Sequence, residues 1–149
     1  MGAQIPDFDE HGCLPPGVYS VSIEDVVNRF GGSKSLKRSQ LTKNLKDFYS
    51  FVRYYATEIY IDGSYVTQKL APRDIDMIVI FPLEFFANIV AHHRFSDFSK
   101  DHVKYKLHMF PFIDGKDEKK KKIRLNYFTH ARPEDGGYEK GIIQVECKK

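Results

Sequence analysis

The chain has 149 residues, of which 42% are hydrophobic and 29% are charged, and its formal net charge is +3 at pH 7. This composition is typical of a globular protein and excludes bulk disorder, and a chain of this length buries roughly two thirds of the surface that it exposes when unfolded. The most apolar window, residues 77–91, is interrupted by Pro82, Glu84 and Asn88 and is shorter than the roughly 20 apolar residues of a membrane span, so we expect one soluble domain over residues 1–149.

The chain carries no feature that directs it out of the cell. Its first residues lack the basic stretch and the apolar run of an export signal. Cys13 and Cys147 lie near opposite ends of the chain and form neither a CxxC pair nor a dense disulfide framework. We therefore expect a cytoplasmic protein.

Two helices are predicted after an N-terminal arm. Residues 1–20 are rich in Pro and Gly, and we expect an irregular arm that packs through Ile5, Phe8, Leu14 and Val18. Ser22 as N-cap, with an acid at Asp25, predicts a capping box and a short helix that ends at Gly31. A longer helix is predicted over residues 34–55, where apolar side chains recur at alternating helical spacings: Leu41, Leu45, Phe48, Val52 and Tyr55.

Two predicted strands flank a tight turn. Residues 58–62 alternate polar and apolar side chains, which is typical of a strand, and Gly63 and Ser64 follow as its exit. Residues 74–81 begin polar and become an apolar run that Pro82 ends. This pattern indicates a central strand whose first residues face solvent.

A third helix is predicted over residues 83–91 from the spacing of its apolar side chains. His92, His93 and Arg94 would then lie at its C-terminal end, where cations complement the helix dipole. Residues 116–122 are dominated by charge, and we expect them to be mobile.

Alternation predicts a further strand over residues 103–110, with His108 and Phe110 on the same face. A last strand is predicted over residues 141–146. Residues 123–128 fit no single element.

Asp74 and Asp76 are the residues that indicate chemistry. Side chains two residues apart on a strand point to the same face. Two carboxylates held that close repel each other unless a divalent cation neutralises them, and Mg²⁺ takes a few carboxylates together with substrate phosphate oxygens. The sequence therefore predicts that Asp74 and Asp76 bind Mg²⁺, or Mn²⁺ in its place.

Gly63 and Ser64 precede this acidic pair by a short connection. Glycine lets a phosphate approach the backbone, and serine offers a hydroxyl and a backbone N–H as donors. We therefore expect Gly63 and Ser64 to bind nucleotide phosphates. For Asp62, just before the turn, we expect side-chain hydrogen bonds that cap the turn rather than metal binding.

This pattern resembles the hallmark of the DNA polymerase beta-like nucleotidyltransferase superfamily, a Gly-Ser turn followed by Asp-hydrophobic-Asp on a strand. Gly63, Ser64, Asp74 and Asp76 match it position by position. The runs IPDFDEHGCLPPG, IDGS and KGII are also similar to a family of small bacterial and phage proteins assigned to that superfamily. The resemblance implies an α+β fold in which helices pack a short mixed β-sheet.

The resemblance also implies an activity, namely Mg²⁺-dependent transfer of a nucleoside monophosphate from an NTP such as ATP to a hydroxyl group. The acceptor would be RNA, a protein or a small molecule. Small members of the superfamily often belong to toxin-antitoxin or phage-defence systems, so the resemblance implies such a setting, and whether a partner protein completes or inhibits the site is left open by the sequence.

The third carboxylate of the superfamily is replaced in this chain. It usually lies on the next strand between two hydrophobic residues, and the matching stretch here is LHM, with His108 in its place. Imidazole can act as a base but is a poorer Mg²⁺ ligand than carboxylate. His108 therefore joins Asp74 and Asp76 as a candidate catalytic residue. The alternative is a degenerate protein that binds a nucleotide, a nucleic acid or a partner protein without turnover.

Lysines fill positions 119–122, and Lys116, Arg124 and Arg132 lie nearby. Such a run either binds nucleic-acid phosphates or forms a solvated charged loop. Neighbouring acids favour the solvated loop. The Phe and Tyr residues are expected to be core residues rather than a base-stacking surface.

Overall fold

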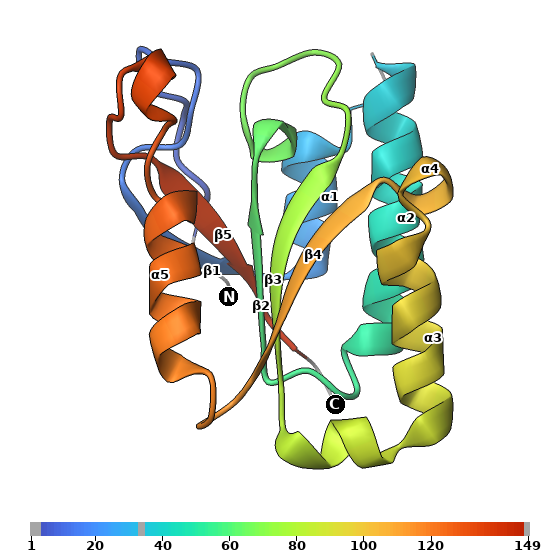
Figure 1. Cartoon of the computed structure of the whole chain (residues 1–149). Coiled ribbons are helices and arrows are strands. Elements are labelled where there is room, and N and C mark those ends of the chain that lie inside the picture. The colour runs from blue at the N-terminus through green and yellow to red at the C-terminus, as the bar shows by residue number, and fades with distance from the viewer. Residues whose placement is uncertain (1–3, 33–34, 148–149) are drawn as a thin grey trace.

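The computed structural model describes residues 4–32 and 35–147, and within these ranges a mixed sheet of five strands has the order β1-β5-β2-β3-β4. β1 runs parallel to β5 and β3 runs parallel to β4, whereas β2 is antiparallel to both of its neighbours. The strands are β1 (Gly17–Val21), β2 (Glu58–Asp62), β3 (Ile75–Phe81), β4 (Leu107–Ile113) and β5 (Gly141–Val145). The expected α+β class, with helices packing a mixed sheet, is confirmed (Figure 1).

Helices cover both faces of the sheet (Figure 1). One face is covered by α1 (Ile23–Phe30), α2 (Leu36–Val52) and α3 (Ile89–Lys100), and the other by α5 (Glu118–Phe128). Shorter turns of helix are α4 (His102–Tyr105), η1 (Ser64–Val66), η2 (Leu83–Ala87) and η3 (Pro133–Asp135). No helix within the described ranges combines the length and the apolar character needed to cross a bilayer.

Side chains that alternate along the strands divide the core into two clusters. Met77 and Val79 of β3 belong to the larger cluster beneath α1, α2 and α3, whereas Ile78 and Ile80 belong to the smaller cluster beneath α5. Polar residues at the same positions as the smaller cluster therefore point to the α5 face of the sheet.

The two N-terminal helices begin much as predicted. Ser22 and Asp25 form the reciprocal hydrogen bonds of a capping box, and Gly31 is the C-cap of α1. The predicted stripe of α2 is buried from Leu41 to Val52, and α2 ends there rather than at residue 55. Residues 1–3 of the predicted arm and Lys34 of the predicted helix lie outside the described residues.

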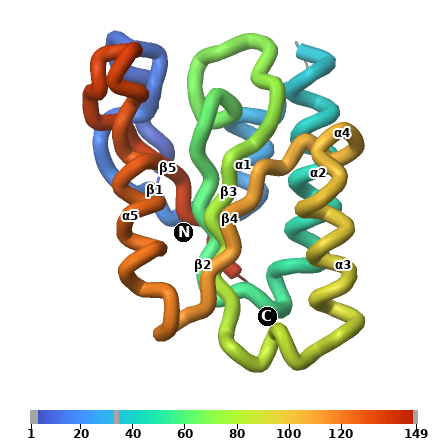
Figure 2. Tube along the Cα trace, viewed as in Figure 1, coloured from blue at the N-terminus to red at the C-terminus, as the bar shows by residue number. Residues whose placement is uncertain are grey.

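The prediction of an irregular arm through residue 20 is wrong at its end, because β1 begins at Gly17 and pairs with β5 over its whole length. Leu14 is buried as expected, but Val18 is 51% exposed, on a strand at the edge of the sheet. The rest of the arm lies against the segment before β5 (Figure 2), where the Cys13 thiol is 3.6 Å from the Tyr138 hydroxyl. The His11 ring also stacks on Tyr138, with ring centroids 3.7 Å apart.

The predicted helix over residues 83–91 is wrong. Residues 83–87 form the η2 turn, and α3 begins only after Asn88, whose side chain caps it by accepting from the Ala91 N–H. His92 and His93 therefore lie in the first half of a helix rather than at the end of one. Apolar residues keep helical spacing on both sides of Asn88, but its side-chain cap begins a new helix there.

The predicted strand over residues 103–110 begins too early. Asp101 caps the short helix α4, and Lys106 then adopts a positive φ of 54° that reverses the chain before β4. The predicted alternation holds from residue 107 onward. β4 lies at the edge of the sheet, where β3 is its only partner among the described residues, and it contains Pro111.

The expectation of a mobile charged segment over residues 116–122 is also wrong, because α5 includes most of it. Glu118 accepts a hydrogen bond from the Gly115 N–H at the start of the helix, and the Lys121 ammonium lies 2.7 Å from Glu58 of β2. Phe128 is buried against the sheet. The packing of Phe128 and Leu125 and the ion pair of Lys121 with Glu58 therefore hold this lysine-rich helix against the sheet.

Arg38 of α2 joins that helix to the loop between β2 and β3. Its side chain is only 8% exposed, and burial lowers its pKa, although Tyr65 acts in the opposite direction. The guanidinium donates hydrogen bonds to the main-chain carbonyl groups of Phe30, Ser64, Tyr65, Thr67 and Lys69. One buried cation therefore fixes most of the first half of this loop.

We expect Arg38→Met to lower the free energy of unfolding by about 3 to 5 kcal/mol, because several buried carbonyl groups lose their donor. Urea denaturation followed by circular dichroism measures the change. Lys43→Met, at an exposed position of the same helix, is the control and should cost less than about 0.5 kcal/mol. Equal stability of the two variants would contradict the anchoring role of Arg38.

Candidate active site

Three polar side chains form a row across neighbouring strands. The register pairs Asp62 of β2 with Asp76 of β3, and Asp76 with His108 of β4. All three lie at the same end of the sheet and on its α5 face, one pair of residues beyond the apolar row that contains Tyr60 and Ile78. The strands thus bring together residues that are far apart in the sequence.

Gly63 brings the turn after β2 against the Asp76 carboxylate. Its φ is +83°, and a Cβ at this position would lie only 2.6 Å from Asp76 Oδ2. Only glycine fits both the backbone conformation and the space. The turn therefore passes directly over one of the two predicted metal ligands.

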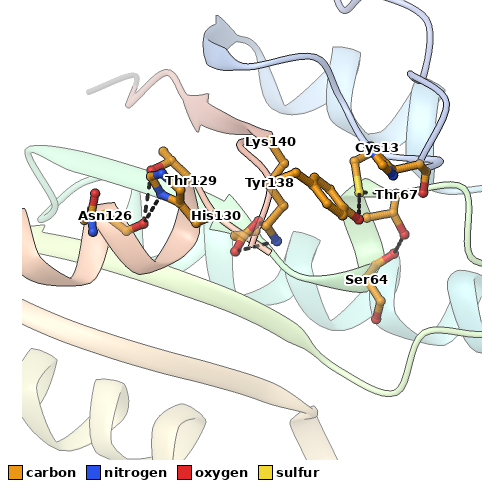
Figure 3. Close-up of polar contacts among 10 residues, drawn as sticks. Cys13, Ser64, Thr67, Asn126, Thr129, His130, Tyr138 and Lys140 are labelled. Carbon is orange, nitrogen blue, oxygen red and sulfur yellow. Dashed lines mark hydrogen bonds and ion pairs between the residues drawn. The ribbon is translucent and has the colours of Figure 1, made fainter. Parts of the chain in front are cut away.

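Ser64 begins the η1 turn immediately after this contact. Its carbonyl accepts a hydrogen bond of 2.7 Å from the Thr67 hydroxyl (Figure 3) and another from the Thr67 N–H. The Ser64 hydroxyl has no hydrogen-bond partner among residues 4–32 and 35–147. The backbone of Ser64 is thus fixed while its hydroxyl is available to a ligand.

Asp76 is the central carboxylate of the site. Burial raises its pKa, the neighbouring Asp74 carboxylate raises it further, and His108 and Lys140 act in the opposite direction. His108 Nδ1 lies 3.2 Å from Asp76 Oδ1, and the His108 side chain is 51% exposed. Asp74 is exposed just before β3, close enough to Asp76 to repel it.

Asp62 has a different partner. It is only 5% exposed, and its two carboxylate oxygens lie 2.9 and 3.2 Å from the Lys140 ammonium. Burial raises the pKa of Asp62 to about 6, although Lys140 and the Gly63 N–H both lower it. The expected link to the turn is thus present through Gly63, but the ion pair with Lys140 is the main contact.

A basic cavity of about 350 Å³ reaches Arg73, the residue before Asp74. Three cationic side chains line it together with uncharged ones: Lys37, Gln40, Leu41, Pro72, Arg73 and Lys106. Anionic groups are the ligands that such a lining favours. Lys37, Gln40 and Leu41 belong to α2, on the opposite face of the sheet from Asp76 and His108, so the cavity is separate from the row of polar side chains.

The donors at this site fit a hard cation that shares its coordination with substrate. Within residues 4–32 and 35–147 no three His, Cys, Asp or Glu side chains are grouped as a metal site. Asp74 and Asp76 supply two carboxylates whose mutual repulsion a cation would relieve, and Mg²⁺ commonly takes its other ligands from water and phosphate. These two residues would hold the metal.

The structure brings Gly63 and His108 into contact with Asp76, with Asp74 close to Asp76, whereas Ser64 is placed only as the residue that follows Gly63. Sequence reasoning missed two residues that support the site, Lys140 and Arg38. Lys140 reaches Asp62 only because β5 pairs with β2, which no local pattern predicts. Arg38, by contrast, lies three residues before Leu41 and so continues the buried stripe of α2, a signal that was present in the sequence.

We expect Gly63→Ala to lower the free energy of unfolding by about 2 to 4 kcal/mol, because it adds backbone strain and a clash with Asp76. Gly115→Ala is the matched control, since Gly115 has a similar φ of +77° but nothing within 4 Å of the added Cβ. Urea denaturation compares the two. If both variants lose the same stability, the contact with Asp76 is unimportant.

The raised pKa of Asp62 predicts a pH dependence of stability. Between about pH 4 and pH 6 the folded protein keeps a proton on Asp62 that the unfolded chain has released, so stability falls as the pH rises through this interval. A shift from 3.8 to about 6 corresponds to about 3 kcal/mol. Urea unfolding should show that the wild-type protein loses about 3 kcal/mol more stability than Asp62→Asn between about pH 4 and pH 6, and parallel profiles would contradict the prediction.

Comparison with known proteins gives one match. Searches among curated proteins and among solved structures each found no match to the chain. A family described as a family of unknown function, DUF6932, matches residues 6–146. That range includes every residue of the site, and the chain therefore belongs to the family of unknown function DUF6932.

Proposed function

We propose that the protein is a Mg²⁺-dependent nucleotidyltransferase that moves a nucleoside monophosphate from an NTP to a hydroxyl group. The observation that carries the proposal is the contact between the Gly63 turn and the Asp76 carboxylate, which leaves no space for a Cβ. A phosphate-binding turn next to a metal-binding carboxylate pair is the arrangement that in-line transfer at phosphorus needs.

Each residue has a role in this proposal. Asp74 and Asp76 hold the metal, which when bound would stabilise the charge on the phosphates and on the leaving pyrophosphate. Gly63 and the free Ser64 hydroxyl bind phosphate oxygens. Lys140 neutralises Asp62, so that this buried acid does not add a further negative charge beside the incoming triphosphate.

His108 is the candidate base for the acceptor hydroxyl. Its contact with Asp76 Oδ1 orients the ring, and its side chain is half exposed, so that an acceptor hydroxyl can approach it. The same contact supports a second candidate function, a nucleotide-binding protein without turnover, because an imidazole takes the position at which the superfamily has its third carboxylate.

The test is pyrophosphate release from each of the four NTPs with Mg²⁺ or Mn²⁺, with bulk tRNA or cell extract as acceptor. We expect release by the wild-type protein and none above background for Asp74→Ala/Asp76→Ala, because the metal ligands are lost. Asp47→Ala removes an exposed carboxylate of α2 and serves as the control that keeps activity.

A second pair of variants separates the two candidate functions. His108→Asp restores a third carboxylate and should retain or raise release, whereas His108→Ala should lower it about 10²- to 10⁴-fold if His108 acts as the base. The wild-type protein and His108→Asp could both bind NTP in a metal-dependent way and release no pyrophosphate from any NTP. This result would reject the transferase and support the nucleotide-binding protein without turnover.

A further inference from the structure

A row of rings extends from the site along β4 to α5. The His102 and His108 rings are 5.9 Å apart, and His108 is 4.6 Å from Phe110. The Arg124 guanidinium lies 4.0 Å from the centre of the Phe110 ring and 5.4 Å from that of Tyr127. We call these five side chains the ring row.

The ring row is largely at the surface, unlike the aromatic cluster of the core around Phe48, Phe81 and Phe85. Tyr127 is 67% exposed, His102 is exposed and half of the His108 side chain is exposed. Only Phe110 also contributes to the core, where its ring meets Phe128 edge to face. Solvent-facing rings in a continuous row have no packing role that explains them.

Positive charge lies next to the ring row on α5. Lys119, Lys120 and Lys122 are exposed, whereas Lys121 is occupied by its ion pair with Glu58. Arg124 belongs to both groups, because it follows these lysines on the helix and stacks on Phe110. Rings for bases and cations for phosphates are the two components of surfaces that bind single strands.

We infer that the ring row binds unpaired bases of a single-stranded nucleic acid whose end reaches Asp76. The inference rests on the proposed function, because it makes this strand the hydroxyl acceptor. One base needs a single stacking surface, and a row of several rings with lysines beside it fits consecutive nucleotides better than the base of a free NTP. Every base has a π-face, so we expect little dependence on sequence.

The test is fluorescence anisotropy of a labelled short RNA, the matching DNA and their duplexes, in EDTA and without NTP. Arg124→Lys keeps the charge but loses the planar group, and Tyr127→Ala removes an exposed ring. Each should weaken binding of the single strands about 5- to 100-fold. Lys43→Ala removes a charge from α2, on the opposite face of the sheet, and should change binding less than twofold.

Three results would overturn the inference. Unchanged strand binding in both Arg124→Lys and Tyr127→Ala would exclude stacking, and duplexes that bind as tightly as single strands would exclude recognition of unpaired bases. The third result is that the variants still bind the strands but no longer bind ATP, as measured by calorimetry with Mg²⁺. This result would assign the ring row to the base of the NTP. Thermal unfolding checks that each variant is folded.

Failure here is separable from failure of the proposed function. The binding assay contains neither metal nor NTP, so an inactive protein would still show whether the ring row holds a strand. Conversely, the wild-type protein could bind no strand and still release pyrophosphate when a protein or a small molecule is the acceptor. If Tyr127→Ala released pyrophosphate at the same rate, the protein would be a transferase with a different acceptor.

Discussion

The buried guanidinium of Arg38 is the constraint on which the site depends. The packing of Leu41 and Leu45 fixes the α2 backbone, and with it the place at which Arg38 meets the loop after β2. No carboxylate within the described ranges pairs with this cation, and main-chain carbonyl dipoles provide its solvation instead. Tyr65, itself fully buried, adds a 2.7 Å hydrogen bond to Thr42 of the same helix.

This anchoring matters because the turn passes close to the Asp76 carboxylate. A Cβ on Gly63 would lie only 2.6 Å from Asp76 Oδ2, so a shift of the loop would change the contact between the turn and this carboxylate. Sites of this kind need supporting contacts that fix the ligating groups in advance. Here the support comes from a helix on the opposite face of the sheet, through Arg38.

The acids at the site are distinguished by their surroundings rather than by their chemistry. Asp62 is buried and paired with a lysine, Asp76 is half-buried beside an imidazole, and Asp74 is exposed. Carboxyl groups whose environments differ this strongly take on different tasks. Asp62 is paired inside the sheet, and Asp74 and Asp76 are the two acids that the proposed function assigns to the metal.

The sequence predicted those parts of the structure that depend on local pattern. The capping box at Ser22, the α2 stripe and the alternation that sets Asp76 are short-range features, and the structure confirms them. β1 and α5 were missed because their stability comes from partners remote in the chain. β1 pairs with β5, and α5 packs on the sheet and forms an ion pair with Glu58. The same reason hid Lys140, whereas Arg38 could have been found from its place on the stripe.

Pro111 has a consequence for how molecules of this protein meet one another. An edge strand presents unpaired main-chain groups to which a strand of a second molecule can add, and natural proteins often prevent this with a proline. Pro111 lies in the middle of β4 and offers no amide hydrogen, and the exposed edge beside it is also interrupted where Lys106 turns the chain. The edge that carries His108 and Phe110 is therefore a poorer template for a strand of a second molecule than an uninterrupted edge would be.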